Sequence, residues 1–184
     1  MKKIILGFIG EIASGKGTAC DYFIKKHHAG YHRFSRILRD ILDRIYLPQT
    51  RENMQKMSTW LRKTFSEEIF AKVIAEEVKA DRTPIVCVDG IRRPADITHL
   101  KKLPNFKLIY VTADEKIRYE RIVKRAENAD DTVKTFKQFQ KDQKQEAESM
   151  IAEIKKSANY TVNNNGTQNE LNLALEKLLK RIKK

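Results

Sequence analysis

The residues with the clearest chemical meaning lie near the amino terminus, where positions 10–18 read GEIASGKGT. Their spacing follows the G-x-x-x-x-G-K pattern of phosphate-binding loops, with one additional glycine, Gly17, before the hydroxyl residue Thr18. Glycine lets consecutive backbone N–H groups point inward at a phosphate chain, and the start of a helix adds partial positive charge. Lys16 would reach the β- and γ-phosphates, and Thr18 would offer its hydroxyl to Mg²⁺. The motif therefore predicts a site for the phosphates of a nucleotide.

The segments on either side of the loop support this prediction. Residues 3–9 form an apolar run that is typical of a buried strand, and residues 15–28 carry a helical pattern. A strand, a glycine loop and a helix in this order are the context that a phosphate-binding loop requires. The alternative, a glycine-rich turn with an incidental lysine, would not need that context.

A second candidate is the carboxylate of Asp89, which ends the apolar run of residues 85–88. Parallel strands covered on both faces have such runs, so Asp89 is expected at the tip of a buried strand beside the phosphate loop. There it could hold Mg²⁺ through water or orient an attacking group. The alternative is a simple turn residue before Gly90. Arg92 and Arg93 follow, and their guanidinium groups suit the phosphate of an acceptor.

Three arginines, Arg118, Arg121 and Arg125, lie three and four residues apart, so they share one face of a predicted helix. Like charges on one face repel unless an anion bridges them, and a transferring phosphoryl group is such an anion. The alternative is an exposed helix in which these arginines pair with acidic neighbours. Residues 118–131 would form a short lid, with residues 126–131 as its loop.

The long connection after the second predicted strand, residues 35–80, is the expected acceptor-binding helical segment. Its arginines Arg36, Arg39 and Arg62 would bind phosphate. Trp60 could stack on a base, although a single tryptophan is more often part of the core. The four histidines show no metal-ligand spacing and receive no role.

Strand and helix patterns alternate along the chain, which predicts an α/β fold. The expected architecture is the three-layer P-loop NTPase fold, a five-stranded parallel sheet flanked by helices with a small lid, in a single domain of residues 1–184. Strands are expected at residues 3–9, 31–34, 84–89, 106–111 and 160–163. Helices are expected at residues 15–28, 35–46, 51–80 with a break near Ser66, 95–102, 114–128, 131–157 and 167–182.

Lysine and arginine outnumber the acidic residues, and the formal net charge is +13. Binding to nucleic acid is one interpretation, but the basic residues are spread along the chain without a stripe of interleaved aromatic residues. Such a surface also attracts phosphate-rich substrates. A small phosphorylated acceptor is therefore the favoured partner, and nucleic acid is the alternative.

The first apolar run is too short for a transmembrane helix and lacks a signal-peptide cleavage region, which predicts no membrane partner and a cytoplasmic location. Cys20 and Cys87 match no metal-ligand pattern and are expected to be buried thiols. A chain of 184 residues is long enough for one domain with a sizeable core.

Taken with these motifs, the sequence resembles the nucleoside monophosphate kinase superfamily, which includes adenylate kinase. Residues 10–18 have the adenylate-kinase form of the loop, residues 89–93 (DGIRR) stand where those kinases have D-G-F-P-R, and residues 120–125 (ERIVKR) resemble the segment entering their lid. The sequence is most similar to archaeal-type predicted nucleotide kinases, which are described as related to AMP and CMP kinases or dephospho-CoA kinases. Glu11 in the loop and Arg92 in place of the proline depart from the superfamily pattern.

The resemblance implies an enzyme that transfers the γ-phosphoryl group of ATP with Mg²⁺ to a nucleoside or deoxynucleoside monophosphate, as a monomer or homodimer. Lys16, Asp89, Arg121 and Arg125 would be catalytic, with Thr18 and Asp89 binding the metal. The donor would be held by Gly10, Ala13, Ser14, Gly15, Lys16, Gly17, Thr18 and Asn165. The acceptor would be held by Arg36, Arg39, Arg62, Arg92 and Arg93.

Two alternatives stay open at this point. One is a dephospho-CoA kinase, whose acceptor is a hydroxyl group rather than a phosphate. The other is a nucleotide-binding assembly or RNA-associated factor with slow ATPase activity, which the net charge of +13 would suit.

Overall fold

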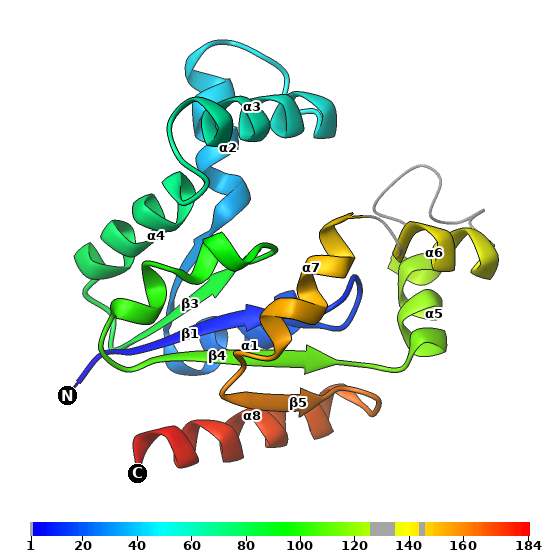
Figure 1. Ribbon diagram of the computed structural model, residues 1–184. Helices are drawn as coiled ribbons and strands as arrows, with labels where there is room; N and C mark the ends of the chain where they lie inside the picture. Colours follow the sequence, from blue (N-terminus) through cyan, green and yellow to red (C-terminus); the bar gives the residue numbers. More distant parts are fainter. Residues whose placement is uncertain (1, 126–134, 144–145) are drawn as a thin grey trace.

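In the computed structural model, which describes residues 2–125, 135–143 and 146–184, the chain folds around one parallel sheet (Figure 1). Neighbouring strands pair in parallel in the order β2-β3-β1-β4-β5. The strands are β1 (Ile4–Ile9), β2 (Gly30–Arg33), β3 (Ile85–Asp89), β4 (Phe106–Thr112) and β5 (Tyr160–Asn163). The predicted five-stranded parallel sheet is confirmed, and each strand begins and ends within one residue of its expected position.

Helices fill the connections between the strands. They are α1 (Lys16–His27), α2 (Phe34–Arg44), α3 (Arg51–Thr64), α4 (Ile69–Ala80), α5 (Glu115–Arg125), α6 (Phe136–Gln143), α7 (Glu146–Lys155) and α8 (Gln168–Lys183), with the 3-10 helices η1 (Pro94–Ile97) and η2 (Leu100–Lys102). The break expected near Ser66 is confirmed, because it falls between α3 and α4. Within the predicted helix 131–157, the structure describes α6 and α7, and residues 131–134 and 144–145 lie outside the described part.

The helix expected at residues 95–102 is wrong in type, because this segment forms two 3-10 turns. The side chain of Asp96 accepts hydrogen bonds from the backbone N–H groups of Arg92 at 2.9 Å and Arg93 at 3.0 Å. These bonds close a tight turn around Pro94, so the chain does not continue into a regular helix.

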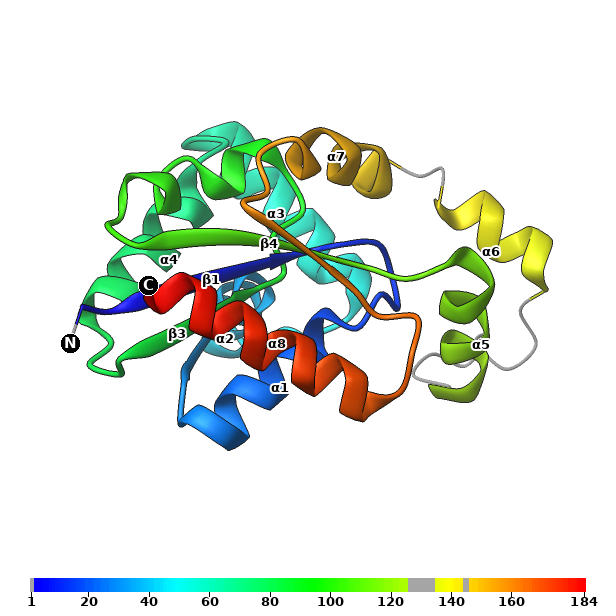
Figure 2. The ribbon, with the colours of Figure 1, turned by 90° about the horizontal axis from the view of Figure 1, so that it is seen from below.

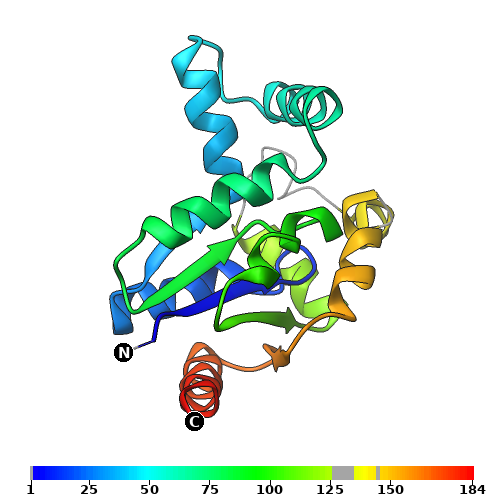
Figure 3. The same ribbon diagram turned by 60° about the vertical axis from the view of Figure 1, so that its left-hand side comes forward.

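The side chains of β1 alternate between two cores, one on each face of the sheet. Leu6 and Phe8 pack in a cluster with residues of α1 and α8, whereas Ile5 and Ile9 pack in a cluster with residues of α4 and α7. Figure 3 shows α4 and α8 on opposite sides of the sheet. Because both faces are covered, the strands consist of nearly continuous apolar residues, as parallel strands usually do.

The two cysteines are confirmed as free, buried thiols, one on α1 and one on β3. Contact with the Cys87 thiol and burial raise the pKa of the Cys20 thiol. Buried structural thiols are chemically inert, so both residues belong to the core. None of the described helices combines the length and the apolar character that a membrane span requires.

All carboxyl ends of the strands lie along one edge of the sheet, and the loops with predicted chemistry leave from this edge. In Figure 1, α2 and α3 rise above this edge, and α5 and α6 stand beyond the end of β4. The expected acceptor segment and the start of the expected lid therefore border the phosphate loop from two sides.

Candidate functional site

The phosphate loop leaves β1 in a conformation that demands small residues. Gly10 and Gly15 have φ angles of 153° and 101°, and Ala13 has a positive φ of 58°. A Cβ on Gly10 would lie 2.1 Å from the backbone oxygen of Val111, and a Cβ on Gly15 would lie 2.1 Å from Nδ2 of Asn164. Both glycines are therefore required by close packing as well as by backbone conformation. The loop rests against the end of β4 and the turn after β5.

Lys16 begins α1 and bends back over the loop. Its Nζ donates hydrogen bonds to the backbone oxygens of Gly10 at 2.7 Å and Glu11 at 2.8 Å. The ammonium charge thus lies over the first residues of the loop. Thr18 follows in the first turn of the same helix, half-buried, and Gly17 between them leaves open space on its side.

Glu11, which departs from the superfamily pattern, points its carboxylate toward the end of β4. Its Oε1 accepts a hydrogen bond of 2.5 Å from the hydroxyl of Tyr110. Burial and this carboxylate raise the pKa of Tyr110, so its hydroxyl stays a donor. Glu11 therefore braces the loop against the sheet.

Asn164, in the turn after β5, contacts the phosphate loop although the sequence analysis did not single it out. Its Nδ2 donates a hydrogen bond of 2.8 Å to the backbone oxygen of Ser14, and its backbone oxygen accepts one of 2.8 Å from Arg121. The predicted donor ligand, Asn165, instead accepts a hydrogen bond of 2.7 Å from the backbone N–H of Asp114. The signal in the sequence was the run of three asparagines after a strand, but nothing in it distinguishes the one that contacts the loop.

Asp89 ends β3 directly beside the end of β1, because Val88 pairs with Gly7. The carboxylate is buried and accepts hydrogen bonds from the backbone N–H of Gly90 at 2.7 Å and the hydroxyl of Tyr31 at 3.0 Å. Burial and the charge of Asp89 raise the pKa of Tyr31, so this hydroxyl remains protonated. The carboxylate is therefore held in one orientation at the edge of the sheet.

The arginines of α5 have different roles in the structure. Arg121 donates to the backbone oxygen of Asn164, and its other terminal nitrogen, Nη1, is buried without a hydrogen-bond partner in the described structure. Burial lowers the pKa of Arg121. A partly buried cation of this kind favours an anion beside it. The side chain of Arg125 and the lid loop 126–131 lie outside the described residues.

Arg118 points into the protein rather than sharing an exposed face with Arg121. Its Nε donates to the backbone oxygen of Ala113 at 3.0 Å, and its Nη1 donates to the backbone oxygen of Ile12 at 3.3 Å. Its guanidinium also lies 5.6 Å from the ring centre of Phe139 on α6. Arg118 therefore ties α5 and α6 to the phosphate loop, and of the two arginines whose side chains the structure describes, Arg118 is buried and Arg121 only partly so.

Four of the predicted acceptor arginines lie near the carboxyl edge with exposed or partly exposed side chains. Arg36 and Arg39 both lie on α2. Nε of Arg36 is 3.9 Å from Oδ2 of Asp40, and Nη1 of Arg39 donates a hydrogen bond of 2.8 Å to Oε1 of Gln49, which follows the helix. Arg92 and Arg93 follow β3 in the turn that Asp96 closes.

Arg62 lies elsewhere, in a buried ion pair. It is 7% exposed, and its Nη2 donates to Oδ1 of Asp96 at 2.7 Å. Its Nη1 donates to the backbone oxygen of Glu67, and its guanidinium stacks 4.8 Å from the ring centre of Phe70. Arg62 therefore holds α3 and α4 to the turn that carries Arg92 and Arg93, and its guanidinium has no open face for an acceptor. Trp60, expected in the core, is 56% exposed and contacts Phe65 edge-on instead.

Comparison with known sequences identifies one matching domain family and relatives that share the name UPF0200. The AAA domain family matches residues 9–137. A UPF0200 protein of Sulfurisphaera tokodaii is 30% identical over 180 residues, which cover 97% of each chain. A UPF0200 protein of Pyrococcus horikoshii is 25% identical over 186 residues, again covering 97% of each chain.

Comparison with solved structures supports the fold. A shikimate kinase of Bacteroides thetaiotaomicron superposes with a TM-score of 0.56 at 13% identity and covers 98% of this chain and 99% of its own. A gluconokinase of Sinorhizobium meliloti superposes with a TM-score of 0.58 at 12% identity and covers 98% and 95%. At these identities the likeness shows the fold alone, which is that of P-loop kinases.

Proposed function

We propose that this chain, which belongs to the UPF0200 family and the AAA domain family and has a P-loop kinase fold, transfers the γ-phosphoryl group of Mg-ATP to a nucleoside or deoxynucleoside monophosphate. The observation that carries the proposal is the packing of the phosphate loop, the buried carboxylate of Asp89 and the partly buried guanidinium of Arg121 around one edge of the sheet.

The donor side is supported by buried polar groups without partners. Within the described structure, Ser14 Oγ and Arg121 Nη1 have no hydrogen-bond partner. Leaving a buried donor unpaired costs about 1–3 kcal/mol, which a bound anion would offset. Together with the left-handed Gly15 and the ammonium of Lys16, these groups fit the triphosphate of ATP.

Magnesium fits the same edge because it needs few protein ligands. It usually takes one or two protein oxygens and completes its shell with water and phosphate oxygens. The hydroxyl of Thr18 and the carboxylate of Asp89 would supply these oxygens, and the described side chains include no larger cluster of His, Cys, Asp or Glu that could hold a metal. The ion would neutralise charge on the transferred group.

The acceptor side is supported by arginines that are not engaged in buried ion pairs. Arg36, Arg39, Arg92 and Arg93 lie on the segments that border the carboxyl edge, and guanidinium forks suit phosphate oxygens. A phosphate acceptor is already ionised near neutral pH, so it needs no general base. Asp89 would then serve as a metal ligand, and no step requires its carboxylate to take a proton.

The chain would act by positioning and charge neutralisation. An oxygen of the acceptor phosphate attacks the γ-phosphorus while the bond to the β–γ bridging oxygen breaks, and ADP leaves. Lys16 and Arg121 would stabilise the charge that develops on the transferred group and on ADP, and Arg125 would join them from the end of α5. Closure of residues 118–131 would exclude water, since ATP would otherwise be hydrolysed.

A panel of acceptors tests this proposal with the full chain and Mg-ATP. ADP release is measured with each ribonucleoside and deoxynucleoside monophosphate, with dephospho-CoA, and with no acceptor. We expect at least one monophosphate to stimulate ADP release and to yield an equal amount of its diphosphate. Lys16→Ala should abolish this stimulation, whereas Lys180→Ala, a matched exposed lysine on α8, should keep it.

Two results would contradict the proposal. Turnover with dephospho-CoA and with no monophosphate would favour the hydroxyl acceptor. ADP release that no acceptor changes, together with RNA binding that weakens steeply with salt, would favour the RNA-associated ATPase.

A further inference from the structure

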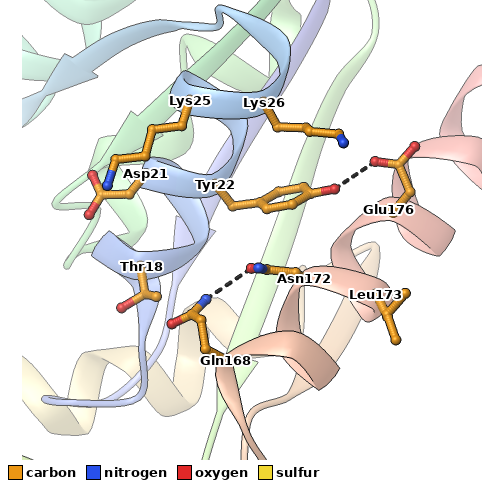
Figure 4. A pocket seen from close by; sticks show the side chains of 9 residues that line it. All are labelled: Thr18, Asp21, Tyr22, Lys25, Lys26, Gln168, Asn172, Leu173 and Glu176. Carbon is orange, nitrogen blue, oxygen red and sulfur yellow. Dashed lines mark hydrogen bonds between the residues drawn. The ribbon is translucent and has the colours of Figure 1, made fainter.

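An open groove of about 820 Å³ runs between α1 and α8. The two helices lie side by side on one face of the sheet (Figure 2). Figure 4 shows the ring of Tyr22 lying between them, with its hydroxyl directed at Glu176 of α8. Apart from Thr18, the residues that line the groove have no part in the proposed transfer.

The groove begins at the phosphate loop. Thr18 lies in the first turn of α1, two residues after Lys16, and Gln168 is the first residue of α8. Both residues line the same end of the groove. From Gln168 to Glu176 the groove follows about 12 Å of helix, at 1.5 Å per residue, which is comparable with the length of a nucleoside.

The walls of the groove combine apolar surface with hydrogen-bonding groups. The ring of Tyr22 and the side chain of Leu173, which is 60% exposed, supply the apolar surface. The Nε2 of Gln168 donates a hydrogen bond of 2.9 Å to Oδ1 of Asn172, and this bond orients both carboxamides. A carboxamide carries two donor hydrogens and one acceptor oxygen, so the pair can bond further to the edge of a heterocyclic base.

Hydrogen bonds within the protein hold the side chains at the far end of the groove. The hydroxyl of Tyr22 donates a hydrogen bond of 2.6 Å to Oε2 of Glu176, and Nε2 of His27 lies 3.0 Å from the same oxygen. Burial, reinforced by Glu176, raises the pKa of Tyr22 to about 12, so the hydroxyl remains a donor at neutral pH. A site whose side chains are already held loses less conformational entropy when it binds.

We propose that this groove receives the nucleoside of the donor nucleotide, with the base packed on Tyr22 and its edge hydrogen-bonded to the carboxamides of Gln168 and Asn172. The inference rests on the proposed function, because the phosphate loop must hold the phosphates for the nucleoside to reach the groove. Thr18 belongs both to the phosphate-loop motif and to the lining of the groove, so a donor whose phosphates occupy the loop has the groove directly beside it. The groove therefore selects a nucleotide over a bare phosphate chain.

Calorimetry with two Mg²⁺-loaded probes, ATP and inorganic tripolyphosphate, tests this inference on the full chain. The two probes share the triphosphate and differ in the nucleoside. Asn172→Trp fills the groove from the surface of α8 without disturbing the core, and Gln168→Ala removes one carboxamide. Asn169→Trp is the matched control, because Asn169 is exposed on the same helix and does not line the groove. Thermal unfolding checks that each variant is folded.

We expect wild-type protein to bind ATP at least about tenfold more tightly than tripolyphosphate. In Asn172→Trp, the Kd for ATP should rise to within about threefold of the Kd for tripolyphosphate, whose binding should not change. Gln168→Ala should lie between these two, and Asn169→Trp should behave as wild type.

Each contrary result has a distinct meaning. If folded Asn172→Trp binds ATP as tightly as wild type, or if wild type binds both probes equally, the groove does not hold the nucleoside and the proposed function stands. If neither probe binds wild-type protein, the proposed function itself fails, and this inference fails with it.

Discussion

The side-chain amide of Asn164 donates a hydrogen bond of 2.8 Å to the backbone oxygen of Ser14, across 150 residues of sequence. The same amide fills the space that a side chain on Gly15 would need. Through its backbone oxygen Asn164 also holds Arg121. The turn after β5 therefore positions both the phosphate loop and the arginine that would face the phosphates.

Replacing this amide should loosen the loop. Asn164→Ala leaves the buried oxygen of Ser14 without its donor, a loss of about 1–3 kcal/mol in unfolding free energy. We expect a lower denaturation midpoint and an ATP affinity reduced by roughly tenfold, measured by calorimetry. Asn169→Ala, on the exposed surface of α8, is the control and should change neither quantity. Unchanged ATP binding in Asn164→Ala would show that the loop keeps its shape without this bond.

Lys16 should matter for turnover far more than for folding. Its ammonium is placed to meet charge that develops during transfer, and losing one such group costs about 10²–10³ in kcat. Lys16→Ala should therefore lower acceptor-dependent turnover by at least ~100-fold while the unfolding midpoint stays near that of wild type. Single-turnover kinetics check the prediction, and near-normal turnover would remove Lys16 from the mechanism.

Replacing Arg93 should weaken the binding of the acceptor and leave the binding of the donor unchanged. Its side chain is partly exposed after β3 and lies 3.7 Å from Glu67. Arg93→Gln should raise KM for the acceptor at least about tenfold, since a charge-assisted bond contributes about 1.5–3 kcal/mol, and should leave KM for ATP unchanged. Arg82→Gln, an exposed arginine before β3, is the control. An equal rise in both KM values would argue against an acceptor role.

The buried pair of Arg62 and Asp96 should behave as one unit in stability. Removing one partner of a buried ion pair leaves an uncompensated charge and costs about 3–5 kcal/mol. Arg62→Met and Asp96→Asn should each destabilise strongly in urea unfolding, and the double variant should lose much less than the sum. Additive losses would mean that the two side chains do not depend on each other.

The contact between α1 and α8 should depend on pH. The hydrogen bond from Tyr22, with a smaller contribution from His27, holds the pKa of Glu176 below its ordinary value of 4.5. Because the folded state lowers this pKa, the stabilisation is present above pH 4.5 and disappears as the pH falls through the lowered pKa. Tyr22→Phe should be less stable than wild type at pH 7, and the difference should shrink below about pH 4. A constant difference down to pH 2.5 or so would contradict this linkage.

Local patterns were enough to predict the sheet and the loop. The run of residues 85–88 and the spacing of Gly10, Gly15 and Lys16 each describe one stretch of chain, whose backbone geometry depends on neighbouring residues. The arginines show where such reasoning ends. Arg118 was expected to face a transferring phosphoryl group and Arg62 an acceptor phosphate. In the structure Arg118 donates to the backbone oxygens of Ala113 and Ile12, and Arg62 donates to the buried carboxylate of Asp96.

The sequence by itself determined the α/β class, the parallel strands and the phosphate loop of this protein, because periodicity and glycine spacing act over a few residues. Only the tertiary structure decided that Asn164 rather than Asn165 reaches Ser14, and that in the described part of the chain Arg121 rather than Arg118 has a buried nitrogen without a hydrogen-bond partner. Two side chains of the same type have the same chemistry and differ only in the groups that the fold places beside them. That placement depends on how strands far apart in the sequence pair, and no short stretch of sequence specifies this pairing.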